Sequence, residues 1–317
     1  MADEARPTVA VIGTGTIALG WITLFLAYGM RVRVSSRRPD AEQVVLAGLT
    51  TFAAGLADDV PTRYDLSAGL EIHNDLEKAL DGAHVVQENA PDDLSLKQEL
   101  FARIGQAAPP GSLLLSSTSK LLPADFTAHM SDPSRTLVGH PFNPPHVIPL
   151  VEVVGGPRTD PAAIDAAVTF YRSVGRTPVV VRKPVPMFVA NRLQAALLRE
   201  CIHLVREGVV TVAELDEVVT DSIGLRWATT GPFRSFHLGG GQGGLRHWLG
   251  SLGTGLERSW EQLGSPALDE DTLRTILDQA DTAFGERSYE DLAGERDEKQ
   301  NAVLRALRQV QQDRSAR

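Results

Sequence analysis

The stretch TVAVIGTGTIALGWITLFLAYGMRVRVSSRR, residues 8–38, decides the fold of the chain. Thr8–Ile12 is a run of apolar and β-branched residues, which predicts a fully buried strand. Ile17–Tyr28 predicts an apolar helix and Arg31–Ser35 a second strand. Two strands joined by a helix form a βαβ unit, whose right-handed crossover makes the strands parallel. We therefore expect the chain to begin with a doubly wound α/β sheet.

The turn between the first strand and the helix carries a GxGxxA pattern, in which Gly13 and Gly15 are followed by the small residue Ala18. The first glycine permits the tight turn, and the second lets the backbone approach a pyrophosphate. Thr16 and Ile17 open the helix, whose N-terminal N–H groups attract phosphate. A glycine triplet alone is a weak signal, but here a strand precedes it and a helix follows. The pattern therefore predicts a dinucleotide site.

The end of the second strand favours one form of the cofactor. NAD-binding units usually place an Asp or Glu there for the ribose hydroxyls, about 20 residues beyond the glycines. This chain has Ser36, Arg37 and Arg38 at that place. Because guanidinium groups pair with phosphate and no carboxylate repels it, we favour NADP(H) as the cofactor, with NAD(H) as the alternative. A solvated basic turn without cofactor contact is the other interpretation of these residues.

Strands and helices continue to alternate as far as residue 181, which extends the predicted doubly wound sheet. Further strands are predicted at Leu70–His73, His84–Glu88, Leu113–Ser116, Thr136–Gly139, Leu150–Val154 and Thr177–Val181. Helices are predicted at Asp40–Leu56, Leu94–Gln106 and Pro161–Val174.

The pattern changes at Pro184 and Pro186, because two prolines interrupt any helix or central strand. After them the strand signals end and helical periodicity takes over. Helices are predicted at Phe188–Glu207, Val212–Asp221, Leu245–Leu252, Thr272–Phe284 and Asp297–Gln312, with a flexible glycine-rich turn at Leu238–Gly244. We therefore predict a Rossmann-like doubly wound parallel sheet in residues 1–184 and an all-α C-terminal domain in residues 185–317.

Composition excludes several classes of function. The net charge of −9 argues against a nucleic-acid surface, because phosphate backbones require a concentrated basic face. No apolar run approaches the roughly 18 residues that a membrane span needs. Cys201 is the single cysteine, so neither an internal disulfide nor a thiolate metal cluster can form. We therefore expect a cytoplasmic protein without a metal site, a nucleic-acid partner or a membrane partner.

One histidine is a candidate acid/base. His140 follows a predicted strand, and Glu152 comes twelve residues later inside the apolar segment PLVEVV. A base that works near neutral pH is most often a histidine oriented by a carboxylate, and a buried carboxylate needs a partner. We therefore pair Glu152 with His140, while a salt bridge from Glu152 to an arginine is the alternative that spacing leaves open.

Three segments together resemble the L-3-hydroxyacyl-CoA dehydrogenase superfamily: SSTS at Ser116–Ser119, HPFNPPHVIPLVEV at 140–153 and FVANRL at Phe188–Leu193. The resemblance covers nearly the whole chain. It is closest to the branch that acts on free acids, which includes L-carnitine dehydrogenase and L-gulonate 3-dehydrogenase (lambda-crystallin). The run GLRWA, residues 224–228, is similar to carnitine dehydrogenases in particular.

The resemblance implies roles for individual residues. His140 becomes the acid/base paired with Glu152, Ser119 the serine that hydrogen-bonds the reacting oxygen, and Asn191 a substrate-side asparagine. Asp92 and Lys97 occupy positions at which the family lines the cofactor and substrate cleft. The helical second domain implies a homodimer. Departures from the family also occur, and these include Met187 where a glycine is common before the phenylalanine and Ser36 in place of the usual Asp.

Cations near the implied pocket bear on the substrate. Arg226, Arg234 and Lys120 lie in segments that the resemblance places around it, and a guanidinium can grip a carboxylate with two hydrogen bonds. Arg234 and Gln242 stand where we expect acids in a carnitine dehydrogenase, and a quaternary ammonium prefers acids and aromatic faces. We therefore expect a small anionic L-3-hydroxy acid, or its 3-keto acid, rather than carnitine. The alternatives are a 3-hydroxyacyl thioester dehydrogenase and a non-catalytic, crystallin-like dinucleotide-binding protein.

Overall fold

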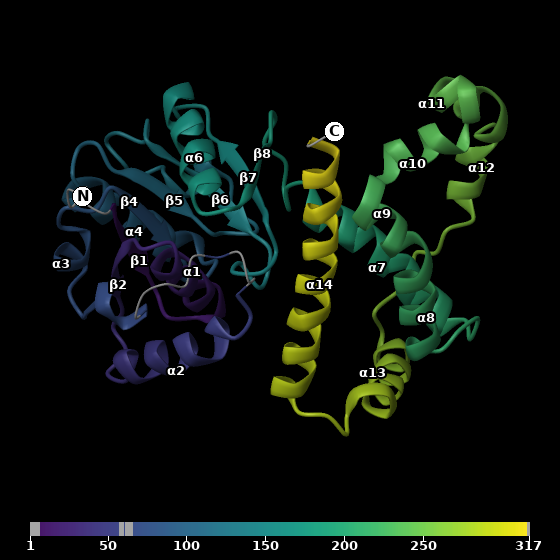
Figure 1. The fold of residues 1–317 in the computed structure, drawn as a ribbon, viewed down its shortest axis with the longest axis horizontal. Coiled ribbons are helices and arrows are strands. Elements are labelled where there is room, and N and C mark those ends of the chain that lie inside the picture. The colour runs from purple at the N-terminus through teal and green to yellow at the C-terminus, as the bar shows by residue number, and fades with distance from the viewer. Residues whose placement is uncertain (1–6, 57–59, 61–65, 316–317) are drawn as a thin grey trace. The chain divides into compact units, whose positions relative to one another are not determined.

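A computed structural model describes residues 7–56, 60 and 66–315 (Figure 1). The chain divides into two compact units. The first comprises the described part of Met1–Asn191 together with Arg296–Ala302, and the second comprises Arg192–Glu295 and the described part of Val303–Arg317. Of the helices in the described ranges, none combines the length and apolar character that a membrane crossing requires.

The first unit is built on one eight-stranded sheet of order β3-β2-β1-β4-β5-β6-β7-β8. This is the predicted doubly wound topology, in which strand order reverses beside β1. The strands are β1 Thr8–Ile12, β2 Arg31–Ser35, β3 Leu70–His73, β4 Val85–Glu88, β5 Leu113–Ser116, β6 Thr136–Pro141, β7 Leu150–Gly155 and β8 Thr177–Val180. One pair departs from the prediction, since β7 runs antiparallel to β6 while the other neighbours are parallel.

Helices pack on both faces of this sheet, as the prediction of a Rossmann-like domain requires. They are α1 Thr16–Ala27, α2 Ala41–Ala53, α3 Leu76–Leu80, α4 Leu94–Ala107, α5 Pro123–Phe126 and α6 Pro161–Ser173, with a 3₁₀ turn at Leu66–Gly69. The short helices α3 and α5 escaped the sequence analysis because four or five residues show no helical period. Aspartates cap α3, α4 and α6, since Asp75, Asp93 and Asp160 each accept a backbone hydrogen bond from the first turn.

The period of two along each strand sorts the core into two clusters. Val9 and Val11 point to the face covered by α1 and α6, where Trp21, Phe25 and Tyr171 are fully buried. Ala10 and Ile12 point to the opposite face, where side chains of α4 and α5 pack. The same alternation directs the polar residues at the strand ends, and this determines which of them can meet.

The second unit is entirely helical in its described residues, which confirms the predicted all-α C-terminal part. Its helices are α7 Ala190–Arg206, α8 Val212–Val218, α9 Leu225–Thr230, α10 Pro232–Gly239, α11 Gly244–His247, α12 Leu256–Glu261, α13 Glu270–Phe284 and α14 Tyr289–Ser315, with π turns at Val219–Gly224 and Trp248–Leu252. The predicted glycine-rich turn at Leu238–Gly244 was wrong in part, because α10 extends to Gly239 and a 3₁₀ turn follows at Gly241–Gly243.

One segment of α14 belongs to the first unit and touches a buried histidine there. Asn301 donates to the carbonyl of Gly55 at 2.8 Å, and Asp297 lies 3.9 Å from Nε2 of His146. His146 is 1% exposed, and neither of its ring nitrogens has a hydrogen-bond partner. Burial lowers the pKa of His146 to about 4, which outweighs the opposite effect of Asp297; the positive charges of Arg176 and Arg296 lower the pKa further.

Stability should therefore fall in mild acid. The unfolded chain takes up a proton at His146 near its ordinary pKa of about 6.5, while the folded chain resists it down to about 4. Below pH 6.5 the unfolded state binds more protons, so the free energy of unfolding drops by up to about 1.4 kcal/mol per pH unit. Between pH 7.5 and 5.0 this amounts to about 2 kcal/mol. His146→Gln should remove this part of the acid sensitivity in denaturant titrations at both pH values. The matched control is His129→Gln at an exposed position, and an equal acid loss in His146→Gln and the unmodified protein would contradict the prediction.

Candidate active site

The antiparallel pairing of β6 and β7 brings the predicted acid/base pair together. In this register His140 lies directly opposite Glu152. Both side chains point to the same face of the sheet, and Nδ1 of His140 is 2.9 Å from Oε2 of Glu152. The two side chains are only 7% and 2% exposed. The alternative partner, an arginine for Glu152, is not what the structure shows.

The second carboxylate oxygen of Glu152 accepts hydrogen bonds from the backbone at the start of helix α7. Oε1 accepts hydrogen bonds from the backbone N–H groups of Val189 at 2.8 Å and Ala190 at 3.0 Å. Burial raises the pKa of Glu152, but the hydrogen bonds from His140 and from these two N–H groups outweigh it and hold the pKa below its ordinary value. A carboxylate that stays ionised only accepts hydrogen bonds, so Nδ1 of His140 carries the proton and Nε2 is left as the basic nitrogen.

A strained turn presents these N–H groups. Met187 has φ of 64° and Phe188 has φ of 52°, both in the left-handed region that favours glycine. Such a conformation costs a residue with a side chain roughly 1–2 kcal/mol. Phe188 is fully buried, and its ring centroid lies 5.4 Å from that of His140. The sequence signal for this turn was Met187 itself, which stands where the family commonly has a glycine.

The glycine turn has the shape that a dinucleotide needs. Gly13 has φ of +103°, and a Cβ at this residue would lie 3.1 Å from the carbonyl oxygen of Asn89. Gly15 is the N-cap residue of α1 without a side-chain cap, and a Cβ built there meets nothing within 4 Å. Thr16 and Ile17 begin the helix. Open space next to an uncapped helix N-terminus fits a pyrophosphate, so these residues would hold the diphosphate of a nicotinamide dinucleotide.

The end of β2 is shaped by hydrogen bonds that sequence reasoning missed. Ser36 is buried, and its hydroxyl lies 3.3 Å from the Thr14 hydroxyl in the glycine turn. Arg38 forms a two-point ion pair with Asp40, with Nε–Oδ1 at 2.9 Å and Nη2–Oδ2 at 2.8 Å. The hydrogen bond from Arg38 lowers the pKa of Asp40. Arg37 is exposed.

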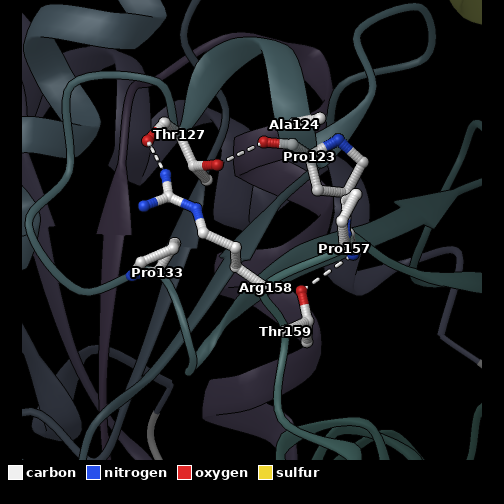
Figure 2. Close-up of a pocket in the computed structure, with 8 residues that line it drawn as sticks. Pro123, Ala124, Thr127, Pro133, Pro157, Arg158 and Thr159 are labelled. Atoms are coloured by element: carbon white, nitrogen blue, oxygen red, sulfur yellow. Dashed lines mark hydrogen bonds between the residues drawn. The ribbon is translucent and has the colours of Figure 1, made fainter.

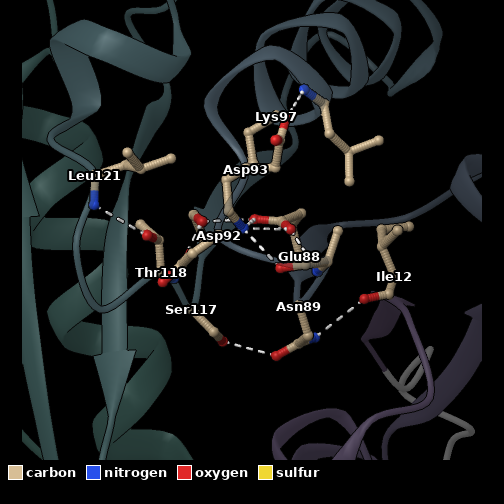
Figure 3. A network of polar contacts seen from close by, with 12 residues as sticks. Ile12, Glu88, Asn89, Asp92, Asp93, Lys97, Ser117, Thr118 and Leu121 are labelled. Carbon is tan, nitrogen blue, oxygen red and sulfur yellow. Dashed lines mark hydrogen bonds and ion pairs between the residues drawn. The ribbon is translucent and has the colours of Figure 1, made fainter.

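A buried charge network occupies the ends of β4 and β5 (Figure 3). The side chain of Lys97 is fully buried, and its ammonium donates to both oxygens of Glu88 at 2.7 and 2.9 Å and to the carbonyl of Ala90 at 3.0 Å. Ser116 donates to Glu88 Oε2 at 2.5 Å from the neighbouring strand. The ammonium of Lys97 also lies 3.5 Å from the carboxylate of Asp92, which is more exposed than that of Glu88. The positive charge of Lys97 therefore acts on both carboxylates.

Asp92 and Ser119, both predicted from the sequence, lie together. The backbone N–H and the hydroxyl of Ser119 both donate to Oδ2 of Asp92 at 3.2 Å. Burial raises the pKa of Asp92, but hydrogen bonding to Thr118, the charge of Lys97 and the hydrogen bonds from Ser119 lower it to a net value below the ordinary one. Asp92 is therefore a charged acceptor that holds the Ser119 hydroxyl at the end of β5.

A second polar chain, on the other face of the sheet, had no signal in the sequence. Tyr171 donates to Gln87 at 2.8 Å, Gln87 donates to Ser117 at 2.8 Å, and Ser117 donates to Asn89 at 2.7 Å. Figure 3 shows Ser117 and Ile12 on either side of Asn89, whose amide lies 3.4 Å from the Ile12 carbonyl. Trp21 adds a bond to Ser117 at 3.2 Å. This chain supports the carbonyl of Asn89 against which Gly13 packs.

Two of the remaining predicted residues, Lys120 and Asn191, belong to the first unit. Lys120 follows Ser119 and is exposed, and Asn191 lies in the first turn of α7, directly after Ala190, whose N–H donates to Glu152. Arg226 on α9 and Arg234 on α10 are exposed and belong to the second unit.

A separate small pocket of about 80 Å³ lies between α5 and the segment after β7 (Figure 2). Its charged residue, Arg158, already donates to the carbonyl of Thr127 at 3.1 Å, and the Thr127 hydroxyl donates to Pro123 at 2.6 Å. None of the predicted site residues lines it. Across the described ranges, no group of three or more His, Cys, Asp or Glu side chains is placed to hold a metal ion.

Comparisons with known proteins agree with this geometry. The model of the 3-hydroxyacyl-CoA dehydrogenase NAD-binding domain matches residues 8–184, and that of the C-terminal domain matches residues 188–292. An L-carnitine dehydrogenase of Streptomyces griseus is 44% identical over 96% of this chain and 91% of its own length. Another, of Streptomyces coelicolor, is 43% identical over 94% of each chain.

A solved structure extends the likeness to three dimensions. The 5-formyl-3-hydroxy-2-methylpyridine 4-carboxylic acid 5-dehydrogenase, described as an NAD⁺-dependent dismutase, superposes with a TM-score of 0.78 at 29% identity, over 96% of this chain and 99% of that one. The resemblance seen in the motifs is thereby confirmed. The chain belongs to the 3-hydroxyacyl-CoA dehydrogenase family, as a dehydrogenase that acts on CH–OH donors.

Proposed function

We propose that the protein transfers a hydride between a nicotinamide cofactor and a small, anionic L-3-hydroxy acid or its 3-keto acid, with His140 as acid/base. The observation that carries this proposal is the buried pair of His140 and Glu152, at 2.9 Å, in the same sheet whose first strand ends in the dinucleotide turn. A protein that only bound the dinucleotide would need no such pair, which argues against the crystallin-like alternative. The domain boundary of this chain near residue 184 and its cytoplasmic location stay predictions.

The arrangement divides the work between two nitrogens of one ring. Glu152 holds the Nδ1 proton, so Nε2 takes the proton of the substrate hydroxyl during oxidation and returns it during reduction. The ionised Glu152 stabilises the imidazolium that forms. Ser119 is proposed to turn its hydroxyl from Asp92 to the reacting oxygen and hydrogen-bond it, and Asn191 to hold the substrate near α7. The bound nicotinamide supplies the hydride acceptor or donor, while this chain moves the proton.

His140→Ala should keep cofactor binding and lose turnover by about 10²–10⁴-fold, the usual contribution of a general base. Glu152→Gln should cost less, because the base remains although its orientation and charge partner are lost. Steady-state kinetics and cofactor titration of both variants measure this, with Glu99→Gln at an exposed position of α4 as the control. Near-normal turnover in His140→Ala would show that another group moves the proton.

NADP(H) is our proposed cofactor, supported by Ser36 in place of an acid and by the two arginines that follow. Replacing Arg37 and Arg38 with alanine and adding Ser36→Asp should shift the preference toward NADH by more than about tenfold, because charge-assisted hydrogen bonds to the 2′-phosphate are lost. Fluorescence titration with both cofactors gives the dissociation constants. Tighter binding of NADH than NADPH by the unmodified protein refutes the preference.

The substrate proposal rests on three cations. We propose that Arg226 grips the substrate carboxylate, while Arg234 and Lys120 favour a further anionic group. Arg226→Ala should raise KM by about tenfold or more, because a two-point ion pair is lost. Arg234→Glu should weaken the binding of a dianionic substrate and allow a cationic substrate to bind. The panel must include L-carnitine, since relatives at 43–44% identity bear that name, and 3-hydroxyacyl thioesters. Efficient turnover of either with Arg234 in place would overturn this assignment.

We propose a homodimer formed through the C-terminal helices. In the second unit, Val205, at 3% exposed, is the only described hydrophobic residue that is buried, while Leu198, Phe233 and Trp260 are 53%, 76% and 58% exposed. Apolar surface on this scale usually marks an interface. Light scattering should give the dimer mass, and Leu198→Asp should lower it toward the monomer. Leu46→Asp on α2, 42% exposed, is the control, and a monomeric unmodified protein would end the proposal.

A further inference from the structure

Arg38 and Asp40 form an ion pair between the end of β2 and the start of α2, where the 2′-phosphate is proposed to bind. The guanidinium meets the carboxylate at two points, 2.9 and 2.8 Å apart, and both side chains remain about half exposed at 56% and 44%. The edge of the guanidinium that carries Nε and Nη2, which could bind a phosphate at two points, is therefore already occupied by Asp40. Arg37, in contrast, makes no hydrogen bond or ion pair with the described part of the chain.

Asp40 is unusual among the aspartates that precede helices in this protein. Asp75, Asp93, Asp160 and Asp269 all accept a hydrogen bond from the first turn of the helix that follows them. Asp40 is the N-cap residue of α2, yet its side chain caps nothing. The backbone of Asp40, at φ −97° and ψ 17°, is not extended as it is in the four capping aspartates, and its carboxylate is turned to Arg38 instead.

We propose that Asp40 sets the cofactor preference by exchange. Arg38 leaves Asp40 for the 2′-phosphate of NADP(H), so the ion pair must be broken before this cofactor binds, and the affinity for it is lowered by that amount. With NAD(H), which lacks the 2′-phosphate, the pair stays closed. Arg37 contributes in both states as a cation without a competing partner. This inference rests on the proposed dinucleotide site. It adds Asp40, at the start of α2, as a residue that affects the cofactor preference and that neither the glycine pattern nor the two arginines identify.

The exchange makes the effect of Asp40 specific to one cofactor. Removing the carboxylate charge frees Arg38 in advance, so binding of NADPH should improve while binding of NADH changes little. Because the pair is exposed, the expected gain is modest, about two- to fivefold in the dissociation constant. Asp40→Asn and Asp40→Ala should give similar gains for NADPH, because neither side chain carries the charge that holds Arg38.

The experiment measures dissociation constants for NADPH and NADH by fluorescence titration of the full chain, together with the cofactor-induced shift in Tm. Asp40→Asn should raise the NADPH-to-NADH affinity ratio about two- to fivefold. Glu42→Gln, which removes the same charge from an acid in the first turn of α2, is the control and should leave the ratio unchanged. In an Arg38→Ala background, Asp40→Asn should have no effect, because the partner that it frees is absent.

Each outcome decides one point. An equal rise in Glu42→Gln, or a rise that persists without Arg38, would overturn the exchange in favour of a general charge effect. An unchanged ratio in Asp40→Asn would show that the carboxylate does not compete for Arg38, and would overturn the proposal. If the unmodified protein prefers NADH, the proposed use of NADP(H) fails, but the exchange is still tested, because it predicts the change in the ratio and not its starting value.

Discussion

The antiparallel pairing of β6 with β7 is the constraint on which the candidate site depends. A parallel neighbour needs a crossover of a dozen or more residues, whereas β7 follows β6 after a short connection and returns beside it. Directly opposed residues of an antiparallel pair share a face, so His140 and Glu152 meet although twelve positions separate them. The connection itself is tied down, because Arg176 donates to the carbonyls of Pro145 and Ile148.

The charge on Glu152 links this strand pair to the start of α7. Two backbone N–H groups and one imidazole N–H share the carboxylate, which replaces the water that burial removed. To present those N–H groups the chain adopts left-handed conformations at Met187 and Phe188, against the preference of both residues. Strain of this kind persists only where packing and hydrogen bonds around the turn hold the backbone in place. Here the fully buried ring of Phe188 holds the turn in its left-handed conformation.

Buried polar groups elsewhere in the first unit follow the same rule. Lys97 and Glu88 compensate one another in a fully buried pair, and removal of either partner would leave an uncompensated charge. The series of hydrogen bonds from Tyr171 through Gln87 and Ser117 holds Asn89, whose backbone carbonyl lies against Gly13. The parallel strand ends therefore carry two polar layers, one on each face of the sheet, and the glycine turn, Ser119 and His140 lie at the ends of strands along this edge.

The sequence by itself determined the elements and the chemical types of the site. The strands were predicted to within a few residues because buried parallel strands are continuous apolar runs, and the glycine turn is a local property of residues 13–18. His140 and Glu152 could be paired from residue type, spacing and family resemblance. Only the tertiary structure decided that β7 runs antiparallel to β6, that Asp40 holds Arg38 and that α7 begins on Glu152. Strand direction and side-chain partners depend on contacts between distant or freely rotating groups, for which a linear pattern carries no signal.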